Sequence, residues 1–123
     1  MSAAARKRLP ERRPSVSETI ERNGLSADVS CGFDPATGEL REIFIFAGKE
    51  GSETRHALED AAVMASVALQ HGIPLEALRR SLARVATGPV DPENLDRRAE
   101  TAPASMIGLA LDAAQRIAAD FGS

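Results

Sequence analysis

The fold is decided by the stretch EIFIFAGKEGS, residues 42–52, and by the alanine-rich run that follows it. Residues 43–46 are all large and apolar, so a strand here has two apolar faces, and both are expected to be covered. The glycines after the strand favour a tight turn, Ser52 suits the helix N-cap position, and Glu53 suits the first helical turn. The stretch therefore predicts a buried strand, from about residue 40 to 47, that turns directly into a helix.

The helix predicted to follow, up to about Gln70, is apolar around more than one face, and Gly72 suits the position just after its end. Its apolar side chains are Leu58, Ala61, Ala62, Ala65, Ala68 and Leu69, broadened by Val63, Met64 and Val67. Such a helix needs contacts on two sides. With the two-faced strand, it predicts cover by a second copy, another subunit or the remaining helix, and a homodimer is the favoured state.

Two further strands are predicted before this stretch. Residues 16–22 alternate weakly, and Asn23-Gly24 predicts a type I′ turn into a second strand. Residues 25–33 alternate between apolar and small or polar side chains, which is typical of a strand with one buried face. Cys31 lies on the apolar face, where a free cysteine packs as a small hydrophobe. A reactive or ligand thiol is the alternative interpretation.

The rest of the chain predicts a short helix from about Pro74, a polar loop over residues 86–102 and a last helix over residues 104–121. Arg79, Arg80 and Arg84 lie on or near the outer side of the short helix. They are interpreted either as a solvated face or as a patch that binds a partner. The predicted fold is α+β: a three-stranded antiparallel β-meander followed by three α-helices packed on the sheet.

Residues 1–14 contain five basic side chains, one acidic side chain and two prolines, so a disordered basic tail is expected before a single domain over residues 15–123. The tail is either solvated or an electrostatic arm for an acidic partner or nucleic acid. The whole chain disfavours nucleic acid, because its net charge is -3 and its only aromatic residues are four Phe. No apolar run could span a bilayer and no secretory signal is evident, so a cytoplasmic protein is expected.

One motif resembles a binding site. The residues that would form it are Gly48, Lys49, Gly51 and Ser52. Free amides at the helix start, the lysine ammonium and the serine hydroxyl could hold a phosphate or a nucleotide. The motif is not a Walker A loop, in which the lysine follows the second glycine, and Glu50 would repel phosphate. A tight strand–helix turn without a ligand is the alternative.

No catalytic constellation, metal site or cofactor is predicted. His56 and Asp60 lie one helical turn apart, which suits an ion pair or a hydrogen bond. The same spacing could hold two metal ligands, but His71 lies too far along the helix to be a third. One cysteine allows neither a cysteine-based zinc cluster nor an intramolecular disulfide.

Five motifs occur along the chain in a specific order. They are LPERRP at residues 9–14, NG at 23–24, EIFI at 42–45, GKEGS at 48–52 and ASVALQHGIPLE at 65–76. In this order they resemble the TSCPD domain, which is found in the C-terminal region of vitamin B12-dependent ribonucleotide reductases. The resemblance covers residues 9 to about 111.

The resemblance implies an accessory-type domain and carries over no catalytic residue. In the region where the family has the Thr-Ser-Cys-Pro-Asp of its name, residues 101–105 read TAPAS, without the cysteine. The reductase reaction needs a thiyl-forming cysteine, a redox cysteine pair and a cobalamin site, which one cysteine cannot supply. We therefore expect a non-catalytic interaction or assembly module. The alternatives are a nucleotide or phosphate sensor and a subunit that completes a B12-dependent reductase in trans.

Overall fold

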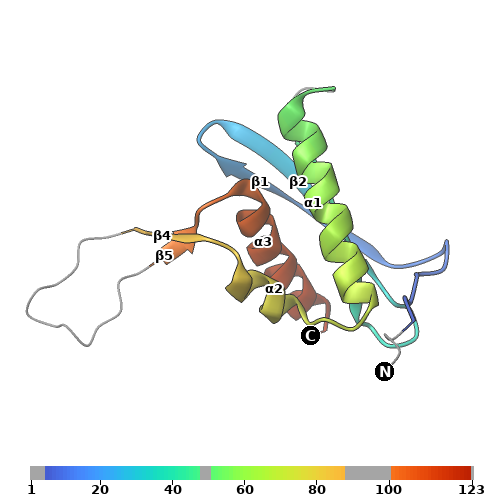
Figure 1. Cartoon of the computed structure of the whole chain (residues 1–123). Helices are drawn as coiled ribbons and strands as arrows, with labels where there is room; N and C mark the ends of the chain where they lie inside the picture. The colour runs from blue at the N-terminus through green and yellow to red at the C-terminus, as the bar shows by residue number, and fades with distance from the viewer. Residues whose placement is uncertain (1–4, 48–50, 88–100, 123) are drawn as a thin grey trace, which may run out of the picture.

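A computed structural model describes residues 5–47, 51–87 and 101–122 of the chain. A three-stranded antiparallel sheet comes first and the helices follow, as Figure 1 shows. The strands, in the order in which they pair, are β1 (Ser15–Arg22), β2 (Leu25–Phe33) and β3 (Leu40–Ala47). The predicted α+β fold with a three-stranded antiparallel meander is confirmed.

The predicted two-residue turn joins β1 to β2. Asn23 and Gly24 have φ angles of 51° and 82°, and a type I′ turn needs positive values at both positions. Arg22 pairs with Leu25 directly across the turn. The hairpin prediction is therefore confirmed at the level of the backbone angles.

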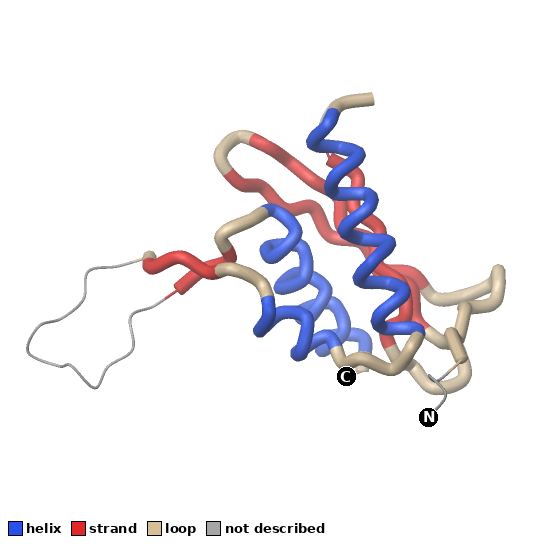
Figure 2. Tube along the Cα trace, viewed as in Figure 1, coloured by secondary structure: helices blue, strands red, loops and turns tan. Residues whose placement is uncertain are grey.

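The helices gather on one side of the sheet (Figures 1 and 2). Their bounds are α1 (Glu53–Gln70), α2 (Leu75–Ser81) and α3 (Met106–Phe121). α1 packs along β3, α3 contacts all three strands, and α2 packs against α3. Ser52 and Ser105 begin the two longer helices as N-caps, because each hydroxyl accepts a hydrogen bond from the amide three residues ahead.

A short second sheet connects α2 to α3. It pairs β4 (Arg84–Ala86) with β5 (Thr101–Pro103). The sequence predicted a loop from residue 86 to 102, and that prediction was wrong at the two ends. Three residues are too few to show an alternating pattern, and every residue of β4 is exposed. In β5 only Pro103 is buried, so burial gives the sequence no alternating pattern that would reveal this ladder.

The core lies between the helices and one face of the sheet. Of the β2 side chains that alternation placed on its apolar face, Leu25 at the start of the strand is half-buried, and the other four are buried: Ala27, Val29, Cys31 and Phe33. Beside them lie Ile43 and Ile45 of β3, and α3 covers this face with a stripe that includes Leu111. The prediction that Cys31 packs in the core is consistent with its zero exposure.

The opposite face of β3 is not covered by the chain itself. Phe44 is 41% exposed and Phe46 is 49% exposed, whereas Ile43 and Ile45 are buried. The expectation that both faces are covered is therefore wrong for a single copy. The remaining helix, α3, packs on the inner face. Of the three covers predicted for the outer face, the remaining helix is therefore excluded, and a second copy and another subunit are left.

Residues 5–14 have neither helix nor strand, yet they contact the domain at several points. The amide of Lys7 donates to the carbonyl of Gln70 at 2.8 Å, and Arg13 pairs with Glu42 at 2.8 Å. The division into a disordered tail over residues 1–14 and a domain over residues 15–123 stays a prediction. Within the described ranges, no helix has the length and apolar character needed to cross a membrane.

Candidate interaction surface

Helix α1 closes the free edge of β3 with polar side chains. The Ser66 hydroxyl accepts a hydrogen bond from the amide of Ile43 at 2.9 Å and donates one to its carbonyl at 3.0 Å. One turn later, Gln70 Nε2 donates to the carbonyl of Arg41 at 3.1 Å. Ser66 and Gln70 are both buried. The edge groups of Ile43 and the edge carbonyl of Arg41 are thus satisfied by the helix, so an added strand cannot pair with this part of β3.

On the outer side of this contact, β3 and α1 form a groove of about 350 Å³. Its apolar part consists of Phe44 and Phe46 from β3 and Val63 from α1, and Val63 is 56% exposed. The sequence indicated the second apolar face of β3 but not the groove. The groove could not be predicted, because the sequence does not show that α1 lies at the edge of β3.

The two ends of the groove carry opposite charges. At one end Arg6 donates a hydrogen bond to the side chain of Gln70, and among the ion pairs of the described residues Arg6 has none. Glu42 also lines the groove, but its charge is paired with Arg13 at 2.8 Å, so Arg6 carries the unpaired charge of this end. At the other end lies Glu59, which pairs with Arg55 one turn earlier at 2.9 Å. A half-buried i, i+4 pair on a helix that solvent still reaches contributes only a few tenths of a kcal/mol, so Glu59 remains free to change partners.

A second groove of about 360 Å³ lies on the opposite flank of α1. Its walls are almost entirely apolar and come from all three helices: Ala61, Met64, Ala65 and Ala68, then Leu78, Ser81 and Leu82, then Ile107 and Leu111. Met64 is 73% exposed. The breadth of apolar surface predicted for this helix therefore corresponds to grooves on both flanks.

The candidate anion site lies only partly within the described residues. Gly48 and Lys49 are outside them. Gly51 has a φ of 78°, which favours glycine, and the Ser52 hydroxyl accepts the amide of Arg55 at 3.1 Å. That hydroxyl is therefore already used by the helix as its N-cap. Phosphate or nucleotide binding at Gly48, Lys49, Gly51 and Ser52 stays a prediction.

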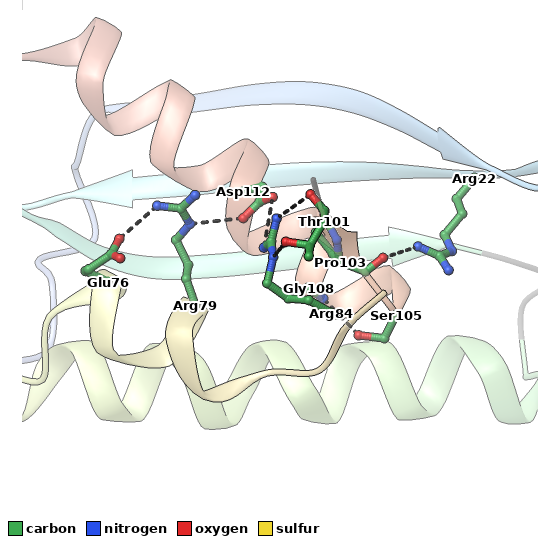
Figure 3. Close-up of polar contacts among 9 residues, drawn as sticks. All are labelled: Arg22, Glu76, Arg79, Arg84, Thr101, Pro103, Ser105, Gly108 and Asp112. Atoms are coloured by element: carbon green, nitrogen blue, oxygen red, sulfur yellow. Dashed lines mark hydrogen bonds and ion pairs between the residues drawn. The ribbon is translucent and has the colours of Figure 1, made fainter. Parts of the chain in front are cut away.

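The arginines of α2 and β4 mostly serve as internal links, as Figure 3 shows. Arg79 donates to Asp112 of α3 at 3.0 Å and also pairs with Glu76 at 2.9 Å. Arg84 lies 3.9 Å from the same Asp112 carboxylate and donates to Thr101 across the small sheet. Asp112 thus ties α2 and β4 to α3. Arg80 is exposed, as a solvated face predicts.

Cys31 is a poor nucleophile in this fold. Burial raises the pKa of its thiol to about 12, and the carboxylate of Glu18 adds to the shift. Only a thiolate attacks or ligates effectively, so the thiol stays inert at neutral pH. The geometry favours the core-packing interpretation over the reactive thiol.

The sequence of the chain matches a known protein family. The sequence model of the TSCPD domain matches residues 4–115. The chain is 34% identical over 71 residues to the vitamin B12-dependent ribonucleotide reductase of Streptantibioticus cattleyicolor, covering 58% of this chain and 12% of that protein. The reductase of the same name from Rhodopirellula baltica is 29% identical over 85 residues, covering 69% of this chain and 8% of that protein.

These relatives are far longer than the region that matches. For the Agrobacterium fabrum protein of the same name, the 71 matched residues are 34% identical and cover 58% of this chain but only 6% of the relative. No solved structure gives a significant match to the chain. The resemblance inferred from the five ordered motifs is confirmed, and the chain belongs to the TSCPD domain family.

Proposed function

We propose that this chain is a non-catalytic interaction module that binds a partner protein through the groove between β3 and α1. The observation that carries the proposal is the exposure of Phe44, Phe46 and Val63 around one groove. Large apolar side chains that cluster at a groove with a charged rim are typical of protein interfaces.

The free energy available at this groove is large enough for binding. A Phe side chain can bury ~150–250 Å². Covering the exposed 41% of Phe44 or 49% of Phe46 would remove roughly 80–100 Å² of apolar surface, which contributes about 2 kcal/mol for each ring. Two such rings side by side are suited to the centre of an interface, where a few side chains dominate the affinity.

Two neighbouring residues of α1 provide a matched test. Val63 faces this groove and Met64 faces the second one, and both are more than half exposed. Val63→Asp and Met64→Asp place the same charge on the same helix but on opposite flanks. Proteins retained by the immobilised full chain are identified, purified and titrated against the wild type and both variants.

We expect at least one purified partner to bind the wild type and Met64→Asp equally and Val63→Asp at least ~10-fold more weakly. Equal binding to all three proteins would show that this groove is not the site. If no purified protein binds and the chain itself stays monomeric, the module proposal is wrong.

A second function is supported by the relatives, which are named vitamin B12-dependent ribonucleotide reductases. In this function the chain completes such a reductase in trans as a separate subunit. The test is the rate of nucleotide reduction by a purified vitamin B12-dependent ribonucleotide reductase polypeptide, measured with and without a stoichiometric amount of this chain. A higher rate with the chain is expected, and identical rates would exclude the subunit function.

A further inference from the structure

We propose that the groove between β3 and α1 binds a second copy of this chain in an antiparallel arrangement, with Arg6 of each copy paired with Glu59 of the other. This inference rests on the proposed function, because it names the partner for the same groove. Three properties of the groove support it: its closed strand edge, its apolar centre and its oppositely charged ends.

The closed edge excludes one common kind of occupant. A peptide that extends a sheet needs free amides and carbonyls on the edge strand. In β3 those of Ile43 are bonded to Ser66, and the carbonyl of Arg41 is bonded to Gln70. Along this part of the edge the occupant must therefore contact side chains, as another folded surface does.

The distribution of charge makes the groove complementary to itself. Arg6 marks one end through its bond to Gln70, and Glu59 lies eleven residues earlier on the same helix. Eleven residues of α-helix span about 16 Å, so the two charges are separated along the groove. A two-fold axis through the centre brings the basic end of each copy to the acidic end of the other, and each contact then occurs twice.

The same axis places the apolar centre against itself. Phe44, Phe46 and Val63 of one copy meet the same three side chains of the other, inside a rim that contains Arg6 and Glu59. This is the usual anatomy of an interface, with an apolar core and a polar rim. A standard interface buries about 800 Å² on each partner, roughly a tenth of the 8176 Å² surface of this chain.

The second groove offers no comparable orientation. None of the residues that line it is charged: they are alanines, leucines, one methionine, one isoleucine and one serine. Nothing in that lining would align a second copy in one direction. Met64→Asp is therefore the matched control for Val63→Asp in the self-association experiment as well.

The test is sedimentation equilibrium of the full chain up to about 100 µM, a range that populates a dimer with a micromolar Kd. Arg6→Glu and Glu59→Arg are each expected to weaken the dimer by on the order of 10-fold, because each reversal places like charges together twice. The double variant Arg6→Glu/Glu59→Arg restores the pairs with inverted sign and is expected to return within ~3-fold of the wild type. Circular dichroism checks that every variant is folded.

Restoration by the double variant cannot arise within one chain. Glu59→Arg also loses the pair with Arg55, and Arg6→Glu also loses the bond to Gln70. Reversing the charge at the distant position repairs neither loss. We further expect Val63→Asp to abolish the dimer and Met64→Asp to leave it unchanged.

A wild-type monomer at the highest concentration, a double variant no better than the single ones, or greater sensitivity to Met64→Asp would each overturn the inference. A wild-type chain that stays monomeric but binds a different purified protein, and loses that binding in Val63→Asp, would leave the proposed function intact. In that case the groove serves a different protein. A monomer that also binds no purified partner would overturn both.

Discussion

Replacing Ser66 with alanine tests whether α1 is held to β3 through the strand edge. The hydroxyl of Ser66 satisfies both the amide and the carbonyl of Ile43, at 2.9 and 3.0 Å, and it is buried. Its removal leaves one buried donor and one buried acceptor without a partner, at about 1–3 kcal/mol each. We expect Ser66→Ala to lower the free energy of unfolding by about 2–6 kcal/mol.

The assay is urea unfolding at one protein concentration, because any self-association also stabilises the native state. Ser81→Ala is the matched control. Ser81 is also a helical serine that donates to a backbone carbonyl, that of Ala77 at 2.7 Å, but it is exposed. Its loss is expected to change the free energy of unfolding by less than ~0.5 kcal/mol.

Hydrogen exchange provides a second measurement at the same site. The Ile43 amide should exchange much faster in Ser66→Ala and remain protected in Ser81→Ala, because it donates to the Ser66 hydroxyl at 2.9 Å. A loss of stability below about 1 kcal/mol with an unchanged exchange rate would refute the reasoning. It would mean that solvent, and not the helix, satisfies the edge of β3.

Three further predictions concern the core, the arginine links and the helix start. The thiol of Cys31, with a pKa raised to about 12, should react with a thiol reagent at pH 8 only when the chain unfolds. Since the folded pKa lies above the unfolded value, the stability that this group contributes is complete below pH ~8.5 and is lost as the pH rises toward 12, which unfolding titrations can follow. Asp112→Ala removes the acceptor for Arg79 and Arg84 and should destabilise the fold by about 1–2 kcal/mol in thermal unfolding, whereas exposed Arg80→Ala should have little effect. Ser52→Ala removes the N-cap of α1 and should lower the free energy of unfolding by ~1 kcal/mol in urea.

Much of the fold could be predicted because its signals are local. Alternation in residues 25–33 identified the buried face of β2, and Asn23-Gly24 identified the hairpin through its need for positive φ angles. The start of α1 followed from the capping chemistry of Ser52. Each of these signals depends only on neighbours along the chain, so the sequence alone carries it.

The candidate surface could be predicted only in part. The four apolar residues 43–46 indicated that β3 has a second apolar face, and that face is exposed in the structure at Phe44 and Phe46. The partners of the strand edge were missed, although Ser66 and Gln70 have the i, i+4 spacing of one helix face. Serine and glutamine in a helix have many uses, so this spacing does not reveal a strand edge beside them.

The sequence by itself determined the order of the first three strands and the three helices, the turn at Asn23-Gly24, the inner face of the sheet and membership of the TSCPD family. Only the tertiary structure decided that α1 closes the edge of β3 and leaves Phe44 and Phe46 beside an open groove. It also decided that Arg6 and Glu59 mark opposite ends of that groove. The physical reason is that periodicity records whether a side chain is buried, whereas the identity of the group that covers it depends on contacts between residues far apart in the chain.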